Sequence, residues 1–284
     1  MPDPAASPGS LYVVATPLGN LEDVTLRALR VLRDVSLVAC EDTRHTRRLL
    51  EAHGIMTPTT SYFEHNERRK GAQVLETLRA GRDVALVSDA GTPAISDPGE
   101  RLVRDARVAG IAVIPVPGPS AATAALSVCG LPTDRFLFVG FLPPKPGARR
   151  KALAALASER TTLVFYESPV RVVDSLADML AAFGDRESFL CREATKLHEE
   201  YVRAPLSSLR ERLAERERVK GEIVLVVAGA PESAAAGEDP LALYRLLAAE
   251  GLTRREAVKE AARRLRRPAR EVYAIVQDAE PEAE

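Results

Sequence analysis

Charged side chains follow three apolar, β-type runs of this chain of 284 residues, at the points where strands would end. They are Asp42, Asp89, Glu193 and Lys196. Because charged groups are costly in a core, such residues should line a cleft, where a carboxylate can accept a proton and a lysine can do so if its pKa is lowered. A structural role is open to each as well, since Asp42 can cap a helix and Lys196 can pair with its acidic neighbours.

Two further loops are built from small, turn-forming and hydroxyl-bearing residues. The segment 88–99 (SDAGTPAISDPG) follows an apolar run, and the segment 117–122 (PGPSAA) opens a helical pattern. Small side chains let a ligand approach the backbone, and a mere connection would be shorter than 88–99. Ser120 is expected to cap the following helix whatever else it does. The turn 16–20 (TPLGN) lacks the glycine spacing of nucleotide-binding loops, which favours a plain strand-to-helix turn.

The elements that must position these groups alternate along the first ~230 residues, which predicts a parallel or mostly parallel α/β protein. Strands are expected at 11–15, 35–40, 84–88, 112–116, 136–141, 162–166, 188–192, 200–203 and 223–227. Helices are expected at 25–32, 46–52, 71–79, 100–108, 121–128, 170–182 and 206–216. In such sheets ligands gather at the carboxyl ends of the strands, where the loops described above begin.

Changes of composition divide the chain. The expected parts are a loose tail (1–10), an N-terminal α/β domain (11–130), a C-terminal α/β domain (131–230), a linker (231–240) and a helical module (241–278). Helices of the module are expected at 241–249, 254–264 and 269–276. Thr253 and Glu256 have the spacing of a capping box, and Pro268 suits the start of the last helix.

Composition and targeting signals argue against several classes of protein. The formal net charge is −1, the three cysteines stand far apart, and the four histidines form no HxxxH pair. These features argue against a disulfide framework and against a metal centre. No apolar run approaches the ~20 residues of a membrane span, and the first residues lack the pattern of a signal peptide. We therefore expect a cytoplasmic protein without a metal or membrane contact.

Positive charge is concentrated near the C-terminus. The segment 252–272 carries eight basic and three acidic residues, which favours a surface for a phosphate backbone, although a solvated helix face is the plainer interpretation. The segment 143–151 (PPKPGARRK) is a second basic stretch, expected on a flexible loop. Candidates for stacking on RNA bases are Tyr62, Phe63 and Tyr273, each of which can equally be packed. The candidate RNA-binding residues are Arg44, Arg149, Arg150, Lys151, Arg254, Arg255, Arg263 and Arg267.

Seven segments, in order along the chain, resemble the motifs of the tetrapyrrole methylase superfamily. They are PLGNLEDVTLRA (17–28), EDTRHTRRLL (41–50), ALVSDAGTPAISDPG (85–99), PGPSAATAAL (117–126), GLPTDRFLFVGFLP (130–143), REATKLHEE (192–200) and KGE (220–222). Within the superfamily they resemble the branch that 2′-O-methylates a cytidine of 16S ribosomal RNA. The resemblance runs from about residue 11 to residue 229, and the C-terminal helices match that branch too.

The resemblance implies two α/β/α domains with a cleft between them for S-adenosyl-L-methionine, a small C-terminal three-helix module, and a homodimer. It implies that the substrate is cytidine 1402 of the 16S rRNA in the 30S subunit and that the cofactor contacts lie among the motif residues. These contacts would be Pro17, Ala90, Gly91, Thr92, Ile95, Ser120, Ala121, Glu167 and Leu190. Methyl transfer needs aligned atoms and removal of the hydroxyl proton, and needs no metal. The catalytic candidates are Lys196 and Asp89 first, then Asp42 and Glu193, with Arg44 on phosphate.

Three other functions compete with this interpretation. A small-molecule methylase acting on a tetrapyrrole precursor would share the core but gain nothing from a basic helical module. A ligand-sensing domain with a helix-turn-helix DNA-binding tail would explain 253–276 but not the charged strand ends. A nicotinamide-dependent dehydrogenase lacks its glycine fingerprint here.

Overall fold

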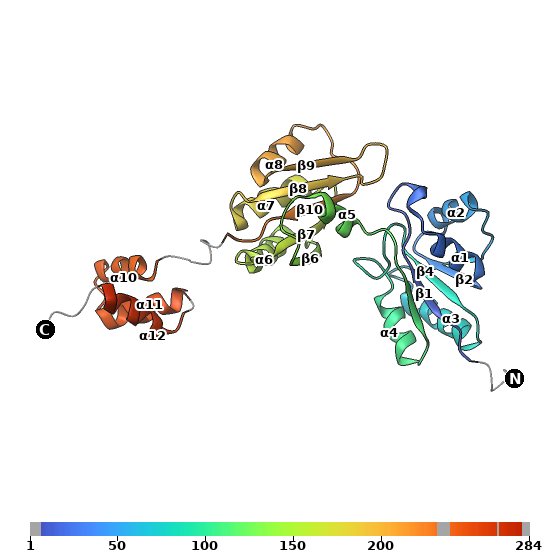
Figure 1. Ribbon diagram of the computed structural model, residues 1–284, viewed down its shortest axis with the longest axis horizontal. Helices are drawn as coiled ribbons and strands as arrows, with labels where there is room; N and C mark the ends of the chain where they lie inside the picture. Colours follow the sequence, from blue (N-terminus) through green and yellow to red (C-terminus); the bar gives the residue numbers. More distant parts are fainter. Residues whose placement is uncertain (1–6, 232–238, 266, 280–284) are drawn as a thin grey trace. The chain divides into compact units, whose positions relative to one another are not determined.

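The computed structural model describes residues 7–231, 239–265 and 267–279 (Figure 1). The chain divides into two compact units, Met1–Leu156 with Thr161–Ala228, and Ala157–Arg160 with Gly229–Glu284. Gly9 and Ser10, which the sequence assigns to the tail, donate backbone hydrogen bonds to the Leu78 carbonyl (2.8 Å) and to Asp83 Oδ1 (2.7 Å). Most of the expected tail (1–6) and linker (232–238) lies outside the described residues.

The first sheet is wholly parallel. Its strands are β1 (Leu11–Val14), β2 (Leu37–Cys40), β3 (Thr59–Ser61), β4 (Val84–Val87) and β5 (Val113–Val116), in the order β3-β2-β4-β1-β5. Helices α1 (Leu26–Asp34) and α2 (Thr43–Ala52) pack in one apolar cluster, and α3 (Glu67–Arg79) and α4 (Glu100–Val108) pack in another. The central strand β4 has all four residues buried, as a strand covered on both faces should.

The second sheet is largely antiparallel, so the expectation of parallel strands is wrong for it. Its strands are β6 (Phe136–Phe141), β7 (Thr162–Glu167), β8 (Glu187–Arg192), β9 (Glu200–Pro205) and β10 (Ile223–Val227), in the order β6-β7-β10-β8-β9. Only β6 and β7 pair in parallel, because the crossover helix α6 (Pro146–Leu156) connects them. Strands β8 and β9 are joined by the short connection 193–199 and therefore run in opposite directions.

Three further helices cover this second sheet. Helix α5 (Ala121–Val128) packs its buried alanines against β7, β8 and β10 of the second sheet. The expected domain boundary at residue 130 would assign this helix to the N-terminal domain. Helix α7 (Val172–Phe183) packs against α6 and α8 (Leu206–Ala214), and the contacts of α7 with Phe165 and Glu167 place it on the face of β7 opposite α5. Because α5 follows β5 of the first sheet directly, its first residues stand at the carboxyl end of that sheet while its body belongs to the second.

Helix α6 and strand β3 were not expected. Residues 143–151 were expected to be a flexible loop, but α6 begins at Pro146, where a proline is favoured in the first turn, and continues through helix-forming residues. A short 3₁₀ helix, η1 (Leu21–Asp23), lies between β1 and α1. Helix α2 begins at Thr43, earlier than the expected residue 46, because the Asp42 side chain accepts a hydrogen bond from the Arg44 amide (2.8 Å) and so caps the helix.

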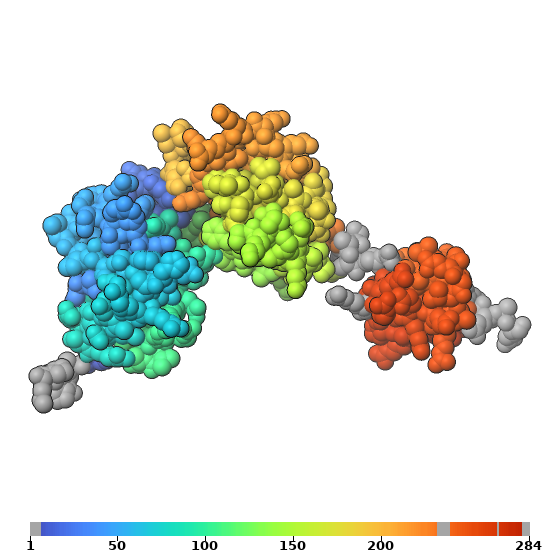
Figure 2. Space-filling view, turned by 180° about the vertical axis from the view of Figure 1, so that it is seen from behind, coloured from blue at the N-terminus to red at the C-terminus, as the bar shows by residue number. Residues whose placement is uncertain are grey.

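The C-terminal unit has its own small core. Helices α10 (Pro240–Ala249), α11 (Arg254–Leu265) and α12 (Ala269–Ala279) bury one apolar cluster that includes Leu243, Leu247 and Val272. One half of the expected capping box is present, since the Thr253 backbone amide donates to Glu256 (3.0 Å), while the Thr253 hydroxyl donates to the same carboxylate (2.6 Å). These helices are drawn in orange and red in the space-filling view (Figure 2).

The described part of the chain contains neither a membrane-spanning helix nor a cluster of metal-binding side chains. No helix there is both long and apolar enough to cross a bilayer. Within the same residues, no group of three or more histidine, cysteine or acidic side chains is placed to hold a metal ion.

Candidate active site

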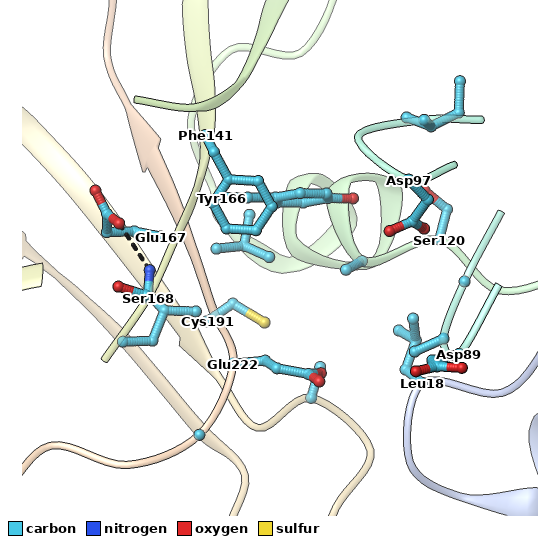
Figure 3. Close-up of a pocket in the computed structure, with 18 of the residues that line it drawn as sticks. Leu18, Asp89, Asp97, Ser120, Phe141, Tyr166, Glu167, Ser168, Cys191 and Glu222 are labelled. Carbon is cyan, nitrogen blue, oxygen red and sulfur yellow. Dashed lines mark hydrogen bonds between the residues drawn. The ribbon is translucent and has the colours of Figure 1, made fainter. Parts of the chain in front are cut away.

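A pocket of about 330 Å³ in the first unit takes residues from both sheets (Figure 3). The loop after β4 forms one wall, the start of α5 forms the floor beside it, and the ends of β7, β8 and β10 form the opposite wall. Of the expected cofactor contacts, those that line this pocket are Ala90, Gly91, Thr92, Ile95, Ser120, Ala121 and Glu167. Pro17 and Leu190 are buried next to the lining residues Leu18 and Cys191, and support the wall from behind.

The small-residue loops are held together by backbone contacts. Thr16 and Gly91 exchange two backbone hydrogen bonds (2.9 and 3.0 Å), and the Thr92 hydroxyl donates to the Pro119 carbonyl (3.2 Å). Gly91 has φ +80°, and a Cβ atom there would stand 3.4 Å from the Leu18 side chain. A glycine is therefore favoured at the point where the loops after β1, β4 and β5 meet.

Asp97 is the pocket residue that sequence reasoning missed. It lies at the end of a loop in which Ala94 and Ser96 both adopt left-handed backbone conformations (φ 66° and 62°), a strain typical of functional loops. Burial, followed by the negative charge of Glu41 and then of other acids nearby, raises the pKa of Asp97 to about 6. In Figure 3 its carboxylate faces the pocket beside Ser120. The only sequence signal for Asp97 was its place in the loop 88–99.

Asp89 and Asp42 are brought together at the ends of neighbouring strands. Asp89 lines the pocket, and its Oδ1 atom accepts a hydrogen bond from the Asp42 backbone amide (3.0 Å). The Asp42 side chain caps α2 and pairs with Arg44 (2.9 Å), whose hydrogen bonds lower the pKa of that carboxyl to about 2. Asp42 therefore positions Asp89 and the start of α2, and the exposed Arg44 side chain remains on the surface beside it.

Lys196 lies beside the pocket with both flanking acids as partners. Its amino group contacts Glu193 (2.8 Å) and Glu222 (3.2 Å), and its methylene groups cover Gly19. Burial alone would lower the pKa of Lys196, but the hydrogen bond with Glu193 and the charge of Glu222 outweigh it and raise the pKa. Lys196 is therefore protonated at neutral pH and fixed in position by Glu193 and Glu222. The Thr195 hydroxyl accepts from the Asn20 amide (3.2 Å), which joins this loop to the loop after β1.

The wall on the side of the second sheet is aromatic. The rings of Phe141 and Tyr166 pack edge to face, with centroids 5.6 Å apart, and the Tyr166 hydroxyl is directed towards the side of the pocket that holds Asp97 (Figure 3). Glu167 follows Tyr166 and is buried, with hydrogen bonds from the Ser168 amide (2.7 Å) and the Ser175 hydroxyl (2.6 Å). Since Arg171 also pairs with it (2.7 Å), the Glu167 carboxylate holds the end of β7 in place.

Some of the candidate RNA-binding side chains are exposed, and others already contact a residue of this chain. Arg149, expected on a flexible loop, is instead 5 % exposed on α6 and pairs with Asp178 (2.6 Å), so its guanidinium is not available to RNA. Its neighbours Arg150 and Lys151 are exposed. In the C-terminal unit Arg255 is exposed, and Arg263 is exposed but pairs with Glu260 (2.6 Å). Arg254 contacts Gln277 (3.2 Å), and Arg267 pairs with Glu271 (3.5 Å).

Comparison with known proteins identifies the fold first. The family model described as Tetrapyrrole (Corrin/Porphyrin) Methylases matches residues 10–210, and the chain belongs to this family. Uroporphyrin-III C-methyltransferase from Thermus thermophilus, solved in complex with S-adenosyl homocysteine, has the same fold, with a TM-score of 0.57 and 24 % identity, covering 78 % of this chain and 97 % of that chain. The expected fold class is confirmed.

Curated relatives then place the chain within the family. The "Ribosomal RNA small subunit methyltransferase I" of Pseudomonas aeruginosa is 52 % identical over 249 residues, 86 % of this chain and 88 % of the relative. The protein of the same name from Halalkalibacterium halodurans is 45 % identical over 273 residues, 94 % of each chain. This chain is a member of the ribosomal RNA small subunit methyltransferase I group and is a methyltransferase. The expected membership is confirmed.

Proposed function

We propose that this protein transfers a methyl group from S-adenosyl-L-methionine to the ribose 2′-oxygen of a cytidine, cytidine 1402, in the 16S rRNA of the small ribosomal subunit. The substrate follows the names of the relatives, which span most of the chain. The observation that carries the chemistry is the pocket, in which acidic groups and an aromatic wall meet loops of small residues. The enzyme would act in the cytoplasm, where the subunit and its rRNA are found.

The lining of the pocket fits this methyl donor. Its acidic side chains include Asp89, Asp97 and Glu222, and none of the described lining residues is a lysine, arginine or histidine. Such a site favours a cation, and the aromatic rings of Phe141 and Tyr166 suit a flat base. Bound there, S-adenosyl-L-methionine supplies a methyl group on a positively charged sulfur, which makes the group electrophilic.

Two parts of the chain would hold the donor. The small residues 90–92 leave their backbone groups accessible, and the first residues of α5 offer amides at a helix N-terminus, which suits a carboxylate. The expectation that Ser120 caps α5 is wrong, since its side chain makes no hydrogen bond to the helix, and the helix N-terminus is therefore not closed by that side chain. Ile95 with Leu18 would close the apolar side. Pro17, Leu190 and Glu167 would shape the walls.

We assign the proton-accepting role to Asp89. It lines the pocket, and the Asp42 amide fixes one of its oxygens (3.0 Å), so that the other can face a substrate hydroxyl. Lys196 is protonated and paired, and its role is to hold Glu193 and Glu222 at the rim rather than to take the proton itself. A positioned base contributes typically ~10²- to 10⁴-fold to such a step.

Recognition of the rRNA would use exposed cations on several elements. Arg44, Arg150 and Lys151 lie on the first unit, and Arg254, Arg255, Arg263 and Arg267 belong to the C-terminal unit, which we propose as a helix-turn-helix-like RNA-binding module. Neutralising phosphates with arginine and lysine gives binding that weakens with salt. The substrate would be the assembled 30S subunit, which presents the rRNA in one conformation.

A second copy of the chain would cover the outer edge of β6. This edge strand exposes Phe136 (47 %) and Leu137 (38 %), and Val128 at the end of α5 is 57 % exposed. Apolar side chains on an unpaired edge strand favour pairing with another chain. We therefore propose a homodimer, which light scattering coupled to gel filtration would show as twice the chain mass of 30.7 kDa.

The proposed function is tested with tritiated S-adenosyl-L-methionine and small subunits from a strain that lacks the enzyme. We expect label on the ribose 2′-oxygen of one 16S cytidine, and an Asp89→Asn variant that binds the donor more weakly and, at saturating donor, transfers methyl groups ~10²-fold more slowly. Asp34→Asn, the same change at an exposed residue of α1, is the matched control. Absence of label on RNA despite donor binding would contradict the proposal and favour a small-molecule methylase.

A further inference from the structure

A second hollow, which we call the α5 groove, adjoins the candidate active site. It has a volume of about 440 Å³ and is open to solvent, and it lies within the first unit. One side is formed by Leu18, Asp23 and Thr25 and the other by Ser120, Thr123 and Ser127 of α5. Leu18 and Ser120 line both the groove and the pocket. Because the groove and the pocket share these two residues, a ligand bound in the groove could extend into the pocket. A methyl acceptor must come this close to the methyl donor.

The α5 side of the groove presents hydrogen-bond acceptors. Thr123 and Ser127 are one helical turn apart, and their hydroxyls donate to the carbonyls of Ser120 (3.1 Å) and Ala124 (2.8 Å). Because each hydroxyl proton is used on the helix, the remaining lone pairs are available to a ligand. The described lining residues include no lysine, arginine or histidine. Such a surface repels phosphate and suits groups that donate hydrogen bonds.

Asp23 faces these hydroxyls from η1. The residue is partly exposed in the groove, yet its Oδ2 atom is buried and has no hydrogen-bond partner in the described structure. A buried carboxylate oxygen without a donor is destabilising. Rotation of the carboxylate about its last bond, which is a soft torsion, brings either oxygen towards a ligand. The exposed oxygen of the Asp23 carboxylate can therefore accept a hydrogen bond from a ligand in the groove, because no described residue donates to it.

We propose that the α5 groove receives the base of the target nucleotide and that Asp23 accepts a hydrogen bond from its exocyclic amino group. This inference rests on the proposed function. Cytosine carries an amino group where uracil carries a carbonyl oxygen, and a carboxylate is a favourable acceptor for that amino group. Against uracil the Asp23 carboxylate would face another acceptor. To reach the groove, the nucleotide must be splayed out of the RNA, which is usual for enzymes that modify single nucleotides.

The test uses small subunits assembled in vitro from transcribed 16S rRNA that carries either cytidine or uridine at the labelled position. For the unaltered protein we expect kcat/KM to favour cytidine by about 10- to 100-fold, the discrimination typical of one well-placed polar contact. Asp23→Asn, which replaces one acceptor oxygen with a donor, should reduce this preference to within about 3-fold while the affinity for S-adenosyl-L-methionine and the Tm stay unchanged. Asp34→Asn on α1 should keep the full preference.

A second variant tests the groove without touching its charge. Ser127 is exposed on α5, so Ser127→Trp should fold normally, fill the groove and reduce RNA methylation by ~10²-fold or more with donor affinity unchanged. The inference is overturned if Asp23→Asn discriminates cytidine from uridine as the unaltered protein does, or if Ser127→Trp methylates RNA at the normal rate. If the unaltered protein labels no RNA, the proposed function itself fails, which is a distinct result.

Discussion

Asp97 should destabilise the folded protein at neutral pH, and its replacement by asparagine should reverse this. The pKa of Asp97 is raised to about 6 by burial and by neighbouring acids, so the fold favours the protonated form. Stability from this group is fully present below its unfolded pKa, ~4, and is lost as the pH rises through about 6. At pH 8 the ionised carboxylate therefore opposes folding, whereas an asparagine of the same shape carries no charge.

The size of the effect follows from the pKa. A rise from ~4 to about 6 corresponds to ~3 kcal/mol against the ionised form, and solvent screening of this partly exposed side chain reduces it to ~1.5 kcal/mol. We expect Asp97→Asn to raise the free energy of unfolding by ~1.5 kcal/mol at pH 8 and by about half as much at pH 5, where the carboxyl is mostly protonated in the fold.

Urea unfolding at the two pH values measures this directly. The midpoint should rise while the dependence on urea stays constant, because the exposed surface does not change. The exposed control Asp34→Asn should change stability by less than ~0.5 kcal/mol at either pH. The reasoning is refuted if Asp97→Asn gives no gain at pH 8, or if its gain is the same at pH 5. Because Asp97 lines the pocket, the same variant should also lose methyl transfer activity.

Two further predictions concern Lys196 and Arg149, each of which forms an ion pair. In steady-state kinetics Lys196→Met should lower kcat by ~10-fold and Lys196→Arg should keep most of the activity, because a cation is required between Glu193 and Glu222. An equal loss in both variants would instead indicate that Lys196 acts as a base. Arg149→Ala should destabilise the protein by ~3 kcal/mol in urea unfolding, because it leaves the Asp178 carboxylate with only the longer contact to the exposed Arg150 (3.8 Å). Arg150→Ala should change stability by under ~0.5 kcal/mol and weaken RNA binding in filter assays.

Elements with a strong burial pattern could be predicted from the sequence. The runs VALV of β4 and IVLVV of β10 are continuous apolar segments buried at every position, a pattern typical of strands covered on both faces. Strand β3 has three residues, all half-buried, and so leaves no pattern in the sequence. The antiparallel returns of the second sheet could not be predicted, because strand direction depends on the length of each connection and on which edge remains free.

Within the site, backbone loops were predictable and side-chain partners were not. Small residues at 88–99 and 117–122 indicated a close approach of ligand to backbone, and both loops line the pocket. Whether Lys196 is a base or a paired cation depends on Glu222, which is 26 residues away in sequence, so spacing could not decide it. Asp97 was missed because aspartate before proline and glycine is typical of an ordinary turn.

The acids of the pocket explain how one arrangement can favour the methyl donor over the product. Burial raises the pKa of Asp97 most, and repulsion by the negative charges of Glu41, Asp89 and Glu222 adds to that rise. A cation in the pocket offsets this repulsion, and the described lining offers no lysine, arginine or histidine to do so. S-adenosyl-L-methionine carries a sulfonium charge that S-adenosyl homocysteine lacks. If the donor binds in this pocket as proposed, the carboxylates would stabilise it more than the product, and the repulsion among them would return after methyl transfer and promote release.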